Sequence, residues 1–306
     1  MQAIDKAKFI DLGGVKQFVM IRSLDRTNPI LLLLHGGTSE SAHFAKFNAQ
    51  LEEDFTLVYW DQRGEGRSRF KDTDSSLLTL ERYLEDTHEL TDYLKKRFKK
   101  EKIYLLAHSM GTLLGMKIIE RYPEDYQAYI AISQVADPIK SDNIAYDELE
   151  KKGVKGLHSI PRVTKENFHS IDFTKRTNKL ISLSIKHGGL YHTSGVLTML
   201  RVSLFPILTF KPYSLRDKFN AMRQHEERIL FYYQHALNES ITKIEVPIYF
   251  IHGKDDYIIN YALTKAYYQA LQTPKKEFIT FESSAHFPSF EEPQKFNAFM
   301  KRIKKI

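Results

Sequence analysis

Short apolar runs alternate with amphipathic stretches along most of the chain. Continuous runs of four to six apolar residues predict strands buried on both faces, and apolar residues at steps of three and four predict the helices that cover them. The predicted strands span residues 30–34, 55–60, 103–107, 128–133, 247–251 and 277–281. The predicted helices span about residues 41–53, 76–99, 109–122, 259–271 and 290–303. This alternation predicts an α/β fold with a mostly parallel central sheet and helices on both faces.

A hairpin-like pattern precedes the alternation of strands and helices, and a helical segment interrupts it. Residues 8–22 carry Gly13-Gly14 between two short β-like runs, which predicts a hairpin. From about residue 137 to residue 240, helical stretches punctuated by glycine and proline replace the alternation. We therefore expect a core made of residues 1–136 and 241–306, with residues 137–240 inserted as a helical lid.

Composition excludes several classes of protein. The chain has 306 residues and no cysteine, which excludes disulfides, thiolate nucleophiles, zinc–cysteine sites and iron–sulfur clusters. The longest purely aliphatic run, residues 30–34, is far shorter than the ~20 apolar residues of a membrane-spanning helix. Residues 1–6 lack the apolar segment of a signal peptide. These features predict a cytoplasmic protein with no membrane partner.

The formal net charge of +7 is concentrated in two clusters, residues 95–102 and 301–306. Both clusters end amphipathic helical patterns, where cations favour the negative end of the helix dipole. A nucleic-acid site would combine such charge with aromatic residues or a recognition motif. Neither accompanies these clusters, so we predict solvated helix ends and no nucleic-acid partner.

Ser109 is the first candidate for chemistry. It lies in Ala107-His108-Ser109-Met110-Gly111, between an apolar run and a predicted helix. A strand that turns directly into a helix crowds the positions two residues either side of the turn, and small side chains there leave the serine hydroxyl exposed. The alternative is a serine that only caps the helix.

Two further candidates follow predicted strands late in the chain. His286 comes after the last strand, at the sheet edge where open α/β folds place their sites. Asp255 and Asp256 follow the strand before it. One carboxylate can orient the imidazole of a serine–histidine pair, but composition does not choose between these two. His35-Gly36-Gly37, after the first buried strand, offers backbone N–H groups to an oxyanion.

In these residues the chain resembles the α/β-hydrolase superfamily, and within it the proline iminopeptidase (prolyl aminopeptidase) branch. The resemblance covers about residues 1–135 and 245–306. Its matching motifs are Leu34-His35-Gly36-Gly37, Tyr59-Trp60-Asp61-Gln62-Arg63-Gly64-Glu65-Gly66-Arg67-Ser68, His108-Ser109-Met110-Gly111 with Gly115, Gly253-Lys254-Asp255-Asp256, and His286 with Phe290-Glu291-Glu292-Pro293.

The resemblance implies a role for each matching residue. Its G-x-x-D motif places the orienting acid on Asp256, and the backbone N–H groups of Gly37 and Met110 become the oxyanion donors. Ser109 and His286 complete a Ser-His-Asp triad that acts through an acyl-enzyme. This chemistry requires no metal and no organic cofactor.

The chain also departs from the family pattern. His35-Gly36-Gly37 continues with Thr38-Ser39 instead of Pro-Gly, and Trp60 is the only tryptophan, so the lid lacks the one usual in this branch. Aminopeptidases of this branch hold the substrate amine with lid carboxylates. Glu226 and Glu227 are the candidates here, and Gln134 is a further substrate-binding candidate.

The predicted function is therefore a serine hydrolase, with an aminopeptidase acting on short peptides as the first interpretation. A carboxylesterase for small esters or amides is the alternative, and a non-catalytic binding member of the fold is a remote one. An amine-binding carboxylate in the lid would favour peptides, whereas a purely apolar lid would favour esters. The sequence indicates no oligomeric state.

Overall fold

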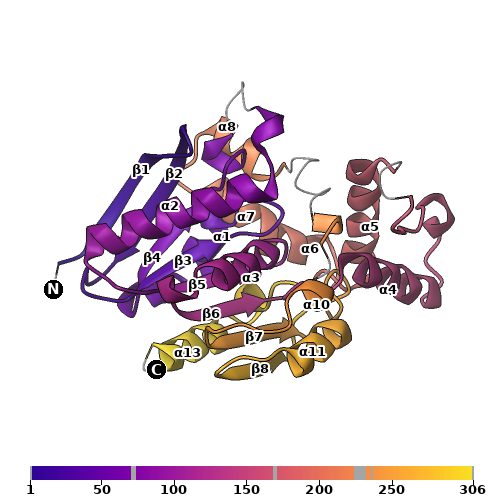
Figure 1. Ribbon diagram of the computed structural model, residues 1–306. Coiled ribbons are helices and arrows are strands. Elements are labelled where there is room, and N and C mark those ends of the chain that lie inside the picture. Colours follow the sequence, from indigo (N-terminus) through magenta and orange to yellow (C-terminus); the bar gives the residue numbers. More distant parts are fainter. Residues whose placement is uncertain (1, 70–73, 168–170, 224–231, 236, 305–306) are drawn as a thin grey trace.

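A single eight-stranded sheet forms the centre of the molecule (Figure 1), in the order β1-β2-β4-β3-β5-β6-β7-β8. The structure is a computed structural model that describes residues 2–69, 74–167, 171–223, 232–235 and 237–304. Its strands are β1 (Ile4–Leu12), β2 (Val15–Ser23), β3 (Ile30–Leu34), β4 (Thr56–Trp60), β5 (Ile103–His108), β6 (Tyr126–Ile132), β7 (Ile248–Gly253) and β8 (Lys276–Phe281). β2 runs antiparallel to β1 and β4, and every later pairing is parallel.

The predicted hairpin is confirmed as β1 and β2. The two strands pair in register from Ile4 opposite Ser23 to Leu12 opposite Val15. Gly13 and Gly14, which join them, have φ values of +54° and +74°. Only glycine adopts this left-handed region at low cost, which is why the glycine pair marks the turn.

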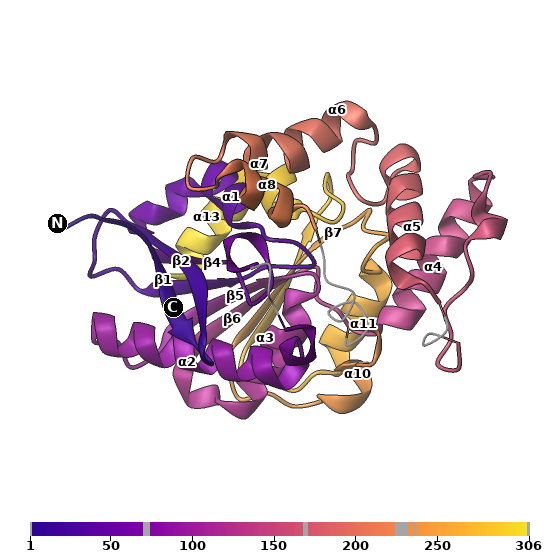
Figure 2. The same ribbon diagram turned by 90° about the horizontal axis from the view of Figure 1, so that it is seen from above.

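Helices cover both faces of the sheet, and alternate residues of each central strand belong to different cores. Along β3, Ile30, Leu32 and Leu34 pack on one side, and Leu31 and Leu33 pack on the other. The first side is covered by α2 (Leu80–Phe98), α3 (Gly111–Arg121) and α11 (Tyr261–Ala270), and the second by α1 (Ser41–Phe47), α12 (Pro288–Glu291) and α13 (Pro293–Ile303). Figure 2 shows α1 and α13 across the sheet from α2 and α3.

Between β6 and β7 the described residues form helices and no strand. The α-helices are α4 (Pro138–Lys151), α5 (Phe173–His187), α6 (Val196–Met199), α7 (Phe205–Thr209), α8 (Leu215–Ala221) and α10 (Leu237–Ser240). A 3₁₀ turn, Leu157–Ser159, and a π-helical turn, Leu200–Leu204, accompany them. Asp137 caps α4 by accepting a hydrogen bond from Lys140 N–H. The Leu237 N–H donates to the Ala136 carbonyl at 2.8 Å, so the segment leaves and rejoins the sheet at neighbouring points. Its assignment as a lid of residues 137–240 on a core of 1–136 and 241–306 stays a prediction.

Two predicted helices differ in detail. The helix expected over 41–53 is α1 followed by a separate 3₁₀ turn, Ala49–Glu53. The helix expected over 290–303 is divided into α12 and α13, because Pro293 lacks the N–H that would continue the first helix.

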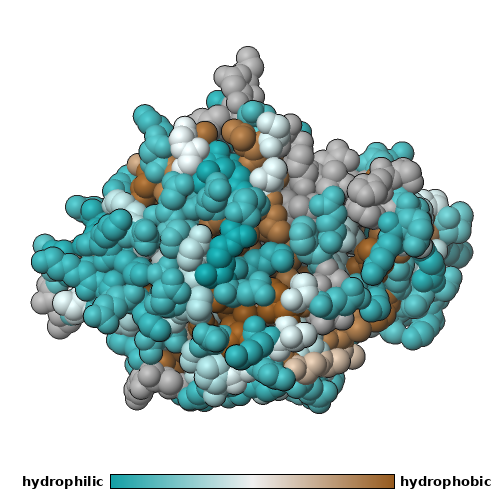
Figure 3. Space-filling model, in the orientation of Figure 1, coloured by the Kyte–Doolittle hydropathy of each residue, from teal (hydrophilic) through white to brown (hydrophobic). Residues whose placement is uncertain are grey.

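The surface in Figure 3 is mostly hydrophilic, with hydrophobic residues in narrow patches between the polar ones. Within the part of the chain that the structure describes, no helix is long and apolar enough to cross a membrane.

Candidate active site

Ser109 lies on the tight turn between β5 and α3, at the carboxyl edge of the sheet. Its φ is +52°, a conformation that non-glycine residues rarely adopt. The turn is held by the Ser109 N–H, which donates to the Ile132 carbonyl at 3.0 Å. A side chain on Gly111 would begin only 2.5 Å from the His35 carbonyl oxygen, which explains why the position needs glycine. The turn therefore presents the hydroxyl in the way that the small flanking residues predict.

Ser109, His286 and Asp256 form one continuous hydrogen-bonded chain. The Ser109 hydroxyl lies 2.9 Å from His286 Nε2, and His286 Nδ1 lies 2.9 Å from Asp256 Oδ2. All three side chains are buried. An ionised carboxylate only accepts, so Nδ1 donates to Asp256 and Nε2 is left to accept from the serine. In this arrangement Nε2 can remove the hydroxyl proton.

Asp256 is fixed by the backbone that follows it. Its Oδ1 accepts the N–H groups of Ile258 and Ile259, each at 2.9 Å. Burial by itself raises the pKa of this carboxyl, but the charge and hydrogen bonds of His286, His252 and the backbone outweigh it and leave the pKa below its ordinary value.

Asp255 is placed elsewhere. Its carboxylate accepts a hydrogen bond from His192 Nδ1 at 2.6 Å and is 47% exposed. The structure therefore brings Asp256 and not Asp255 to His286.

A cavity of about 610 Å³ opens over Ser109. Gly37 and Met110, the two expected oxyanion donors, line it beside the serine and His286. The other lining side chains come from both the sheet edge and the inserted helices; Asp142, Asn178 and Arg223 are polar or charged, and many of the rest are apolar. The apolar ones include Ala145, Leu180, Ile181, Ile185, Leu190, Met199, Met222, Ile258 and Phe287. The cavity suits a small or medium-sized substrate with a substantial apolar part.

Of the three predicted substrate-binding residues, only Gln134 belongs to the part of the chain that the structure describes. Glu226 and Glu227 lie outside the described residues. Gln134 is fully buried, and its amide oxygen accepts from the Tyr129 hydroxyl at 3.2 Å. Its amide nitrogen donates to the Val135 carbonyl at 2.8 Å. These bonds hold the chain after β6, and Gln134 is not among the residues that line the cavity.

A second histidine–carboxylate pair, which the sequence analysis did not find, stands beside the first. His108 Nδ1 donates to Glu40 Oε1 at 2.6 Å, and His108 Nε2 donates to the His286 carbonyl at 2.8 Å. Burial opposes charge on both groups, but their mutual attraction outweighs it. The pKa of Glu40 is lowered, and the pKa of His108 is raised. Because both ring nitrogens face acceptors, His108 is a buried imidazolium.

The D-Q-R-G-x-G-x-S loop joins the sheet edge to the inserted helices. Asp61, buried within it, accepts hydrogen bonds from Ser39, Ser41 and the Tyr213 hydroxyl. A side chain on Gly66 would begin 2.4 Å from Asp61 Oδ2, so the loop requires glycine there. The motif therefore holds the edge of the site and lies outside the Ser109–His286–Asp256 chain.

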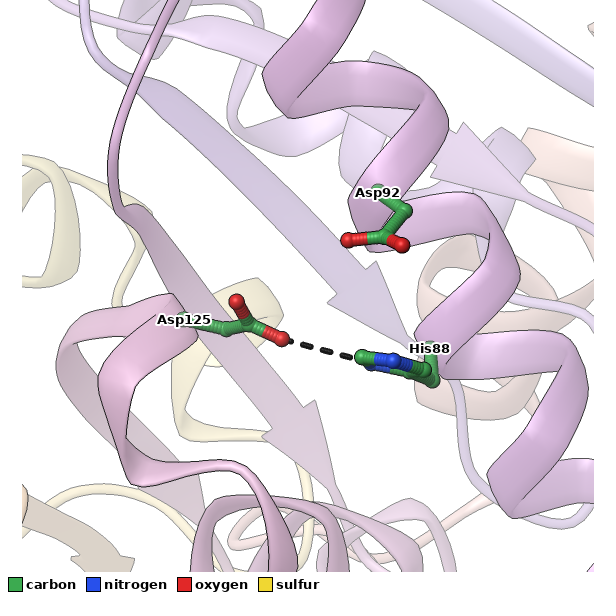
Figure 4. Close-up of side chains that lie close together, drawn as sticks. All are labelled: His88, Asp92 and Asp125. Carbon is green, nitrogen blue, oxygen red and sulfur yellow. Dashed lines mark ion pairs between the residues drawn. The ribbon is translucent and has the colours of Figure 1, made fainter.

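One group of side chains in the described residues has the composition of a metal site. His88, Asp92 and Asp125 converge at the opposite end of the sheet, where Asp125 precedes β6 (Figure 4). His88 Nδ1 lies 3.3 Å from Asp125 Oδ2. The Lys95 ammonium, however, is paired with Asp125 Oδ1. That ammonium supplies the positive charge a metal would bring, so the group is interpreted as an ion-pair network.

Comparison with known proteins identifies the family. The sequence profile of the alpha/beta hydrolase fold family matches residues 29–293. A probable aminopeptidase of Bacillus subtilis (strain 168) is 32% identical over 298 residues, which are 94% of this chain and 93% of that protein. A proline iminopeptidase of Heyndrickxia coagulans is 25% identical over 95% of both chains.

Solved structures show the same fold. A proline iminopeptidase-related protein from Thermus thermophilus superimposes with a TM-score of 0.68 at 19% identity, over 98% of this chain and 96% of that one. The expected fold class and the resemblance to the proline iminopeptidase branch are thereby confirmed. The chain belongs to the α/β-hydrolase family, as a hydrolase with aminopeptidase and esterase relatives.

Proposed function

We propose that this protein is a serine hydrolase that works through an acyl-enzyme, with Ser109 as nucleophile, His286 as general base and acid, and Asp256 as the orienting acid. The observation that supports this proposal is the chain of two 2.9 Å hydrogen bonds from Ser109 through His286 to Asp256. Ser109 and His286 line the cavity of about 610 Å³.

In the first half-reaction, Ser109 Oγ attacks the substrate carbonyl carbon while its proton passes to His286 Nε2. Asp256 stabilises the imidazolium that forms. The negative charge on the carbonyl oxygen would be held by the backbone N–H groups of Gly37 and Met110, at about 3–4 kcal/mol for each donor. The imidazolium then gives its proton to the leaving group as the tetrahedral intermediate collapses.

In the second half-reaction, water replaces the leaving group. His286 removes a proton from water, the hydroxide adds to the acyl carbon, and the proton returns to Ser109 as the acid is released. The serine is restored, and no cofactor takes part in the balance of the reaction.

For the substrate we propose short peptides cleaved after a small N-terminal residue such as proline. The support is the probable aminopeptidase that is similar over 94% of this chain, together with two proline iminopeptidases that are similar over 95% of it. The test compares a prolyl arylamide with a short-chain aryl ester, each on the wild type and on Ser109→Ala. We expect serine-dependent cleavage of the arylamide, and its absence would remove the aminopeptidase.

A carboxylesterase is the second candidate. The apolar side chains in the cavity lining favour it, because a neutral ester can pack against them without a charged partner. A putative esterase/lipase of Mycoplasma genitalium is also 36% identical over 94 residues, 28% of this chain. Serine-dependent cleavage of the ester alone would select this function.

A further inference from the structure

Glu40 carries a buried oxygen atom with no hydrogen-bond partner. Its side chain is 6% exposed, and Oε1 is engaged by His108. Oε2 has no partner. Glu40 precedes α1, but its side chain makes no capping bond to that helix. A carboxylate oxygen buried in this way is costly unless a donor meets it.

This carboxylate stands next to the nucleophile. Glu40 Oε1 and Ser109 Cβ each lie 3.1 Å from the point where a side chain on Gly36 would begin. Glu40 lines the main cavity together with Ser109 and His286. A donor group close to the scissile carbonyl could therefore reach it.

His43 provides a second acceptor without a partner. Its Nε2 donates to the Ser203 carbonyl at 2.9 Å, and its ring is stacked on Phe290. Burial outweighs the neighbouring Glu40 charge and lowers the pKa of His43, so the ring is neutral and Nδ1 carries a lone pair. That Nδ1 is buried and has no hydrogen-bond partner.

Glu40 and His43 both border a side chamber of about 260 Å³. Glu40 also lines the main cavity, so it stands between the two spaces. The remaining walls of the chamber are mostly apolar and include Met199, Leu204, Ile207, Ala221, Met222, Phe287 and Phe290. Two unpaired acceptors at the edge of an apolar chamber fit a ligand with a hydrogen-bond donor beside a small aliphatic group.

We propose that Glu40 and His43 form a subsite for a protonated amine, with the aliphatic group of the same ligand in the side chamber. An ammonium has three N–H donors, so it can supply one to Glu40 Oε2 and one to His43 Nδ1. As a substrate subsite this rests on the proposed aminopeptidase function, and it moves the amine anchor from the inserted helices to the loop after β3.

The charges in this region are compatible with such a ligand. Glu40 and His108 neutralise one another, so a bound ammonium adds one positive charge near Ser109. The oxyanion formed by attack of Ser109 adds one negative charge in the same water-poor space. The ammonium is therefore expected to stabilise the transition state more than the ground state, and to favour substrates whose amine is adjacent to the carbonyl.

The test measures binding and therefore does not depend on which substrate is cleaved. The probes are n-butylammonium and 1-butanol, which have similar size and differ in charge, titrated into the wild type by calorimetry at neutral pH. We expect n-butylammonium to bind at least about tenfold more tightly, since hydrogen bonds to charged groups contribute that much. Equal affinities would overturn the proposal.

Variants then locate the subsite. Glu40→Gln should weaken n-butylammonium binding about tenfold and change 1-butanol binding by less than about twofold. His43→Phe keeps a ring that can stack on Phe290 and removes the acceptor nitrogen. It should weaken n-butylammonium binding by a smaller factor than Glu40→Gln does. Glu148→Gln, a matched control at the partly exposed surface of α4, should leave both probes unchanged. Each variant is first checked for a cooperative thermal transition.

The remaining outcomes separate this proposal from the proposed function. Weaker ammonium binding in Glu226→Gln or Glu227→Gln, with none in Glu40→Gln or His43→Phe, would return the anchor to the inserted segment and overturn the subsite. Ammonium binding that depends on Glu40, with no cleavage of a prolyl arylamide, would uphold the subsite and remove the aminopeptidase. If Glu40→Gln does not fold, His43→Phe and the wild-type comparison decide.

Discussion

Two histidine–carboxylate pairs lie side by side at the carboxyl edge of the sheet, with ring centroids 4.9 Å apart. His286 is 2.9 Å from Asp256, and His108 is 2.6 Å from Glu40. Both pairs are buried, and each joins residues that lie at or after the carboxyl ends of two different strands. The two pairs are therefore similar in residue type and in the distance between the ring nitrogen and the carboxylate oxygen.

They differ in what the second ring nitrogen faces. His286 Nε2 meets the Ser109 hydroxyl, which can donate a proton to it. His108 Nε2 meets the His286 carbonyl, which can only accept. The first ring is therefore free to take up a proton, whereas the second must keep both of its protons. A histidine beside an acid is thus a candidate base only when its other nitrogen faces a group with a proton to give.

His108 and Glu40 position the backbone of His286. The His286 carbonyl accepts from His108 Nε2 at 2.8 Å and from the Ser133 hydroxyl at 3.3 Å. The His286 N–H donates to the Leu190 carbonyl at 3.2 Å. The second pair thus fixes the backbone of the residue whose ring belongs to the first.

The largest expected effect comes from removing the Ser109 hydroxyl, which faces the ring of His286 and has no counterpart at His108. Ser109→Ala should lower kcat by about 10⁴–10⁶-fold, because nucleophile and base act as a unit. Single-turnover kinetics and labelling by an organophosphonate measure it. If the alanine variant is labelled as fast as the wild type, Ser109 is not the nucleophile.

The next effect separates the adjacent aspartates. Asp256→Asn should lower kcat by about 10⁴-fold, because an amide donates to His286 Nδ1 and forces the wrong tautomer. Asp255→Asn should change kcat by less than about twofold, because its carboxylate contacts His192 at the surface. Steady-state kinetics of the two variants, matched in chemistry and adjacent in sequence, give the ranking. The reverse ranking would exchange their roles.

A third effect tests the second pair through stability. Glu40→Gln leaves His108 without its counter-charge, and breaking a buried pair costs about 3–5 kcal/mol of unfolding free energy. The pKa of Glu40 is below the ordinary 4.5, so its contribution is present above pH 4.5 and is lost as the pH falls through the lowered value. The pKa of His108 is above the ordinary 6.5, so its contribution is present below pH 6.5 and is lost as the pH rises through the raised value.

The difference in unfolding free energy between wild type and Glu40→Gln should therefore be largest between pH 4.5 and 6.5. Urea unfolding at a series of pH values measures it. Glu148→Gln, at the partly exposed surface of α4, is the control and should show no such maximum. A difference that stays the same from well below pH 4.5 to well above pH 6.5 would mean that the pair is not ionised in the folded protein.

The smallest effect belongs to another histidine–carboxylate contact, His88 with Asp125. It lies at the opposite end of the sheet, and Lys95 pairs with the other oxygen of Asp125. Asp125→Asn should lower the unfolding free energy by about 1 kcal/mol and leave kcat unchanged. Added zinc should not raise the thermal midpoint of the wild type. A clear rise that is lost in Asp125→Asn would show that the group binds metal.

The sequence predicted the parts of this molecule that depend on neighbouring residues. The alternation of apolar runs predicted every parallel strand to within about two residues, because burial on both faces is visible in a run such as 30–34. Gly13-Gly14 predicted the hairpin, and Gly111 marked the turn of Ser109, because a left-handed or crowded backbone leaves no other choice.

What only the tertiary structure decided depends on residues that are distant in sequence. The choice between Asp255 and Asp256 needed the family motif in the sequence, and in the structure it follows from which carboxylate the β7 turn aims at His286. The pairing of Glu40 with His108 joins residues 68 positions apart. No local pattern marks it, since Glu40 looks like an ordinary acid before a helix. Local periodicity fixes where strands and turns begin, whereas the protonation and role of a side chain depend on the partners that folding brings to it.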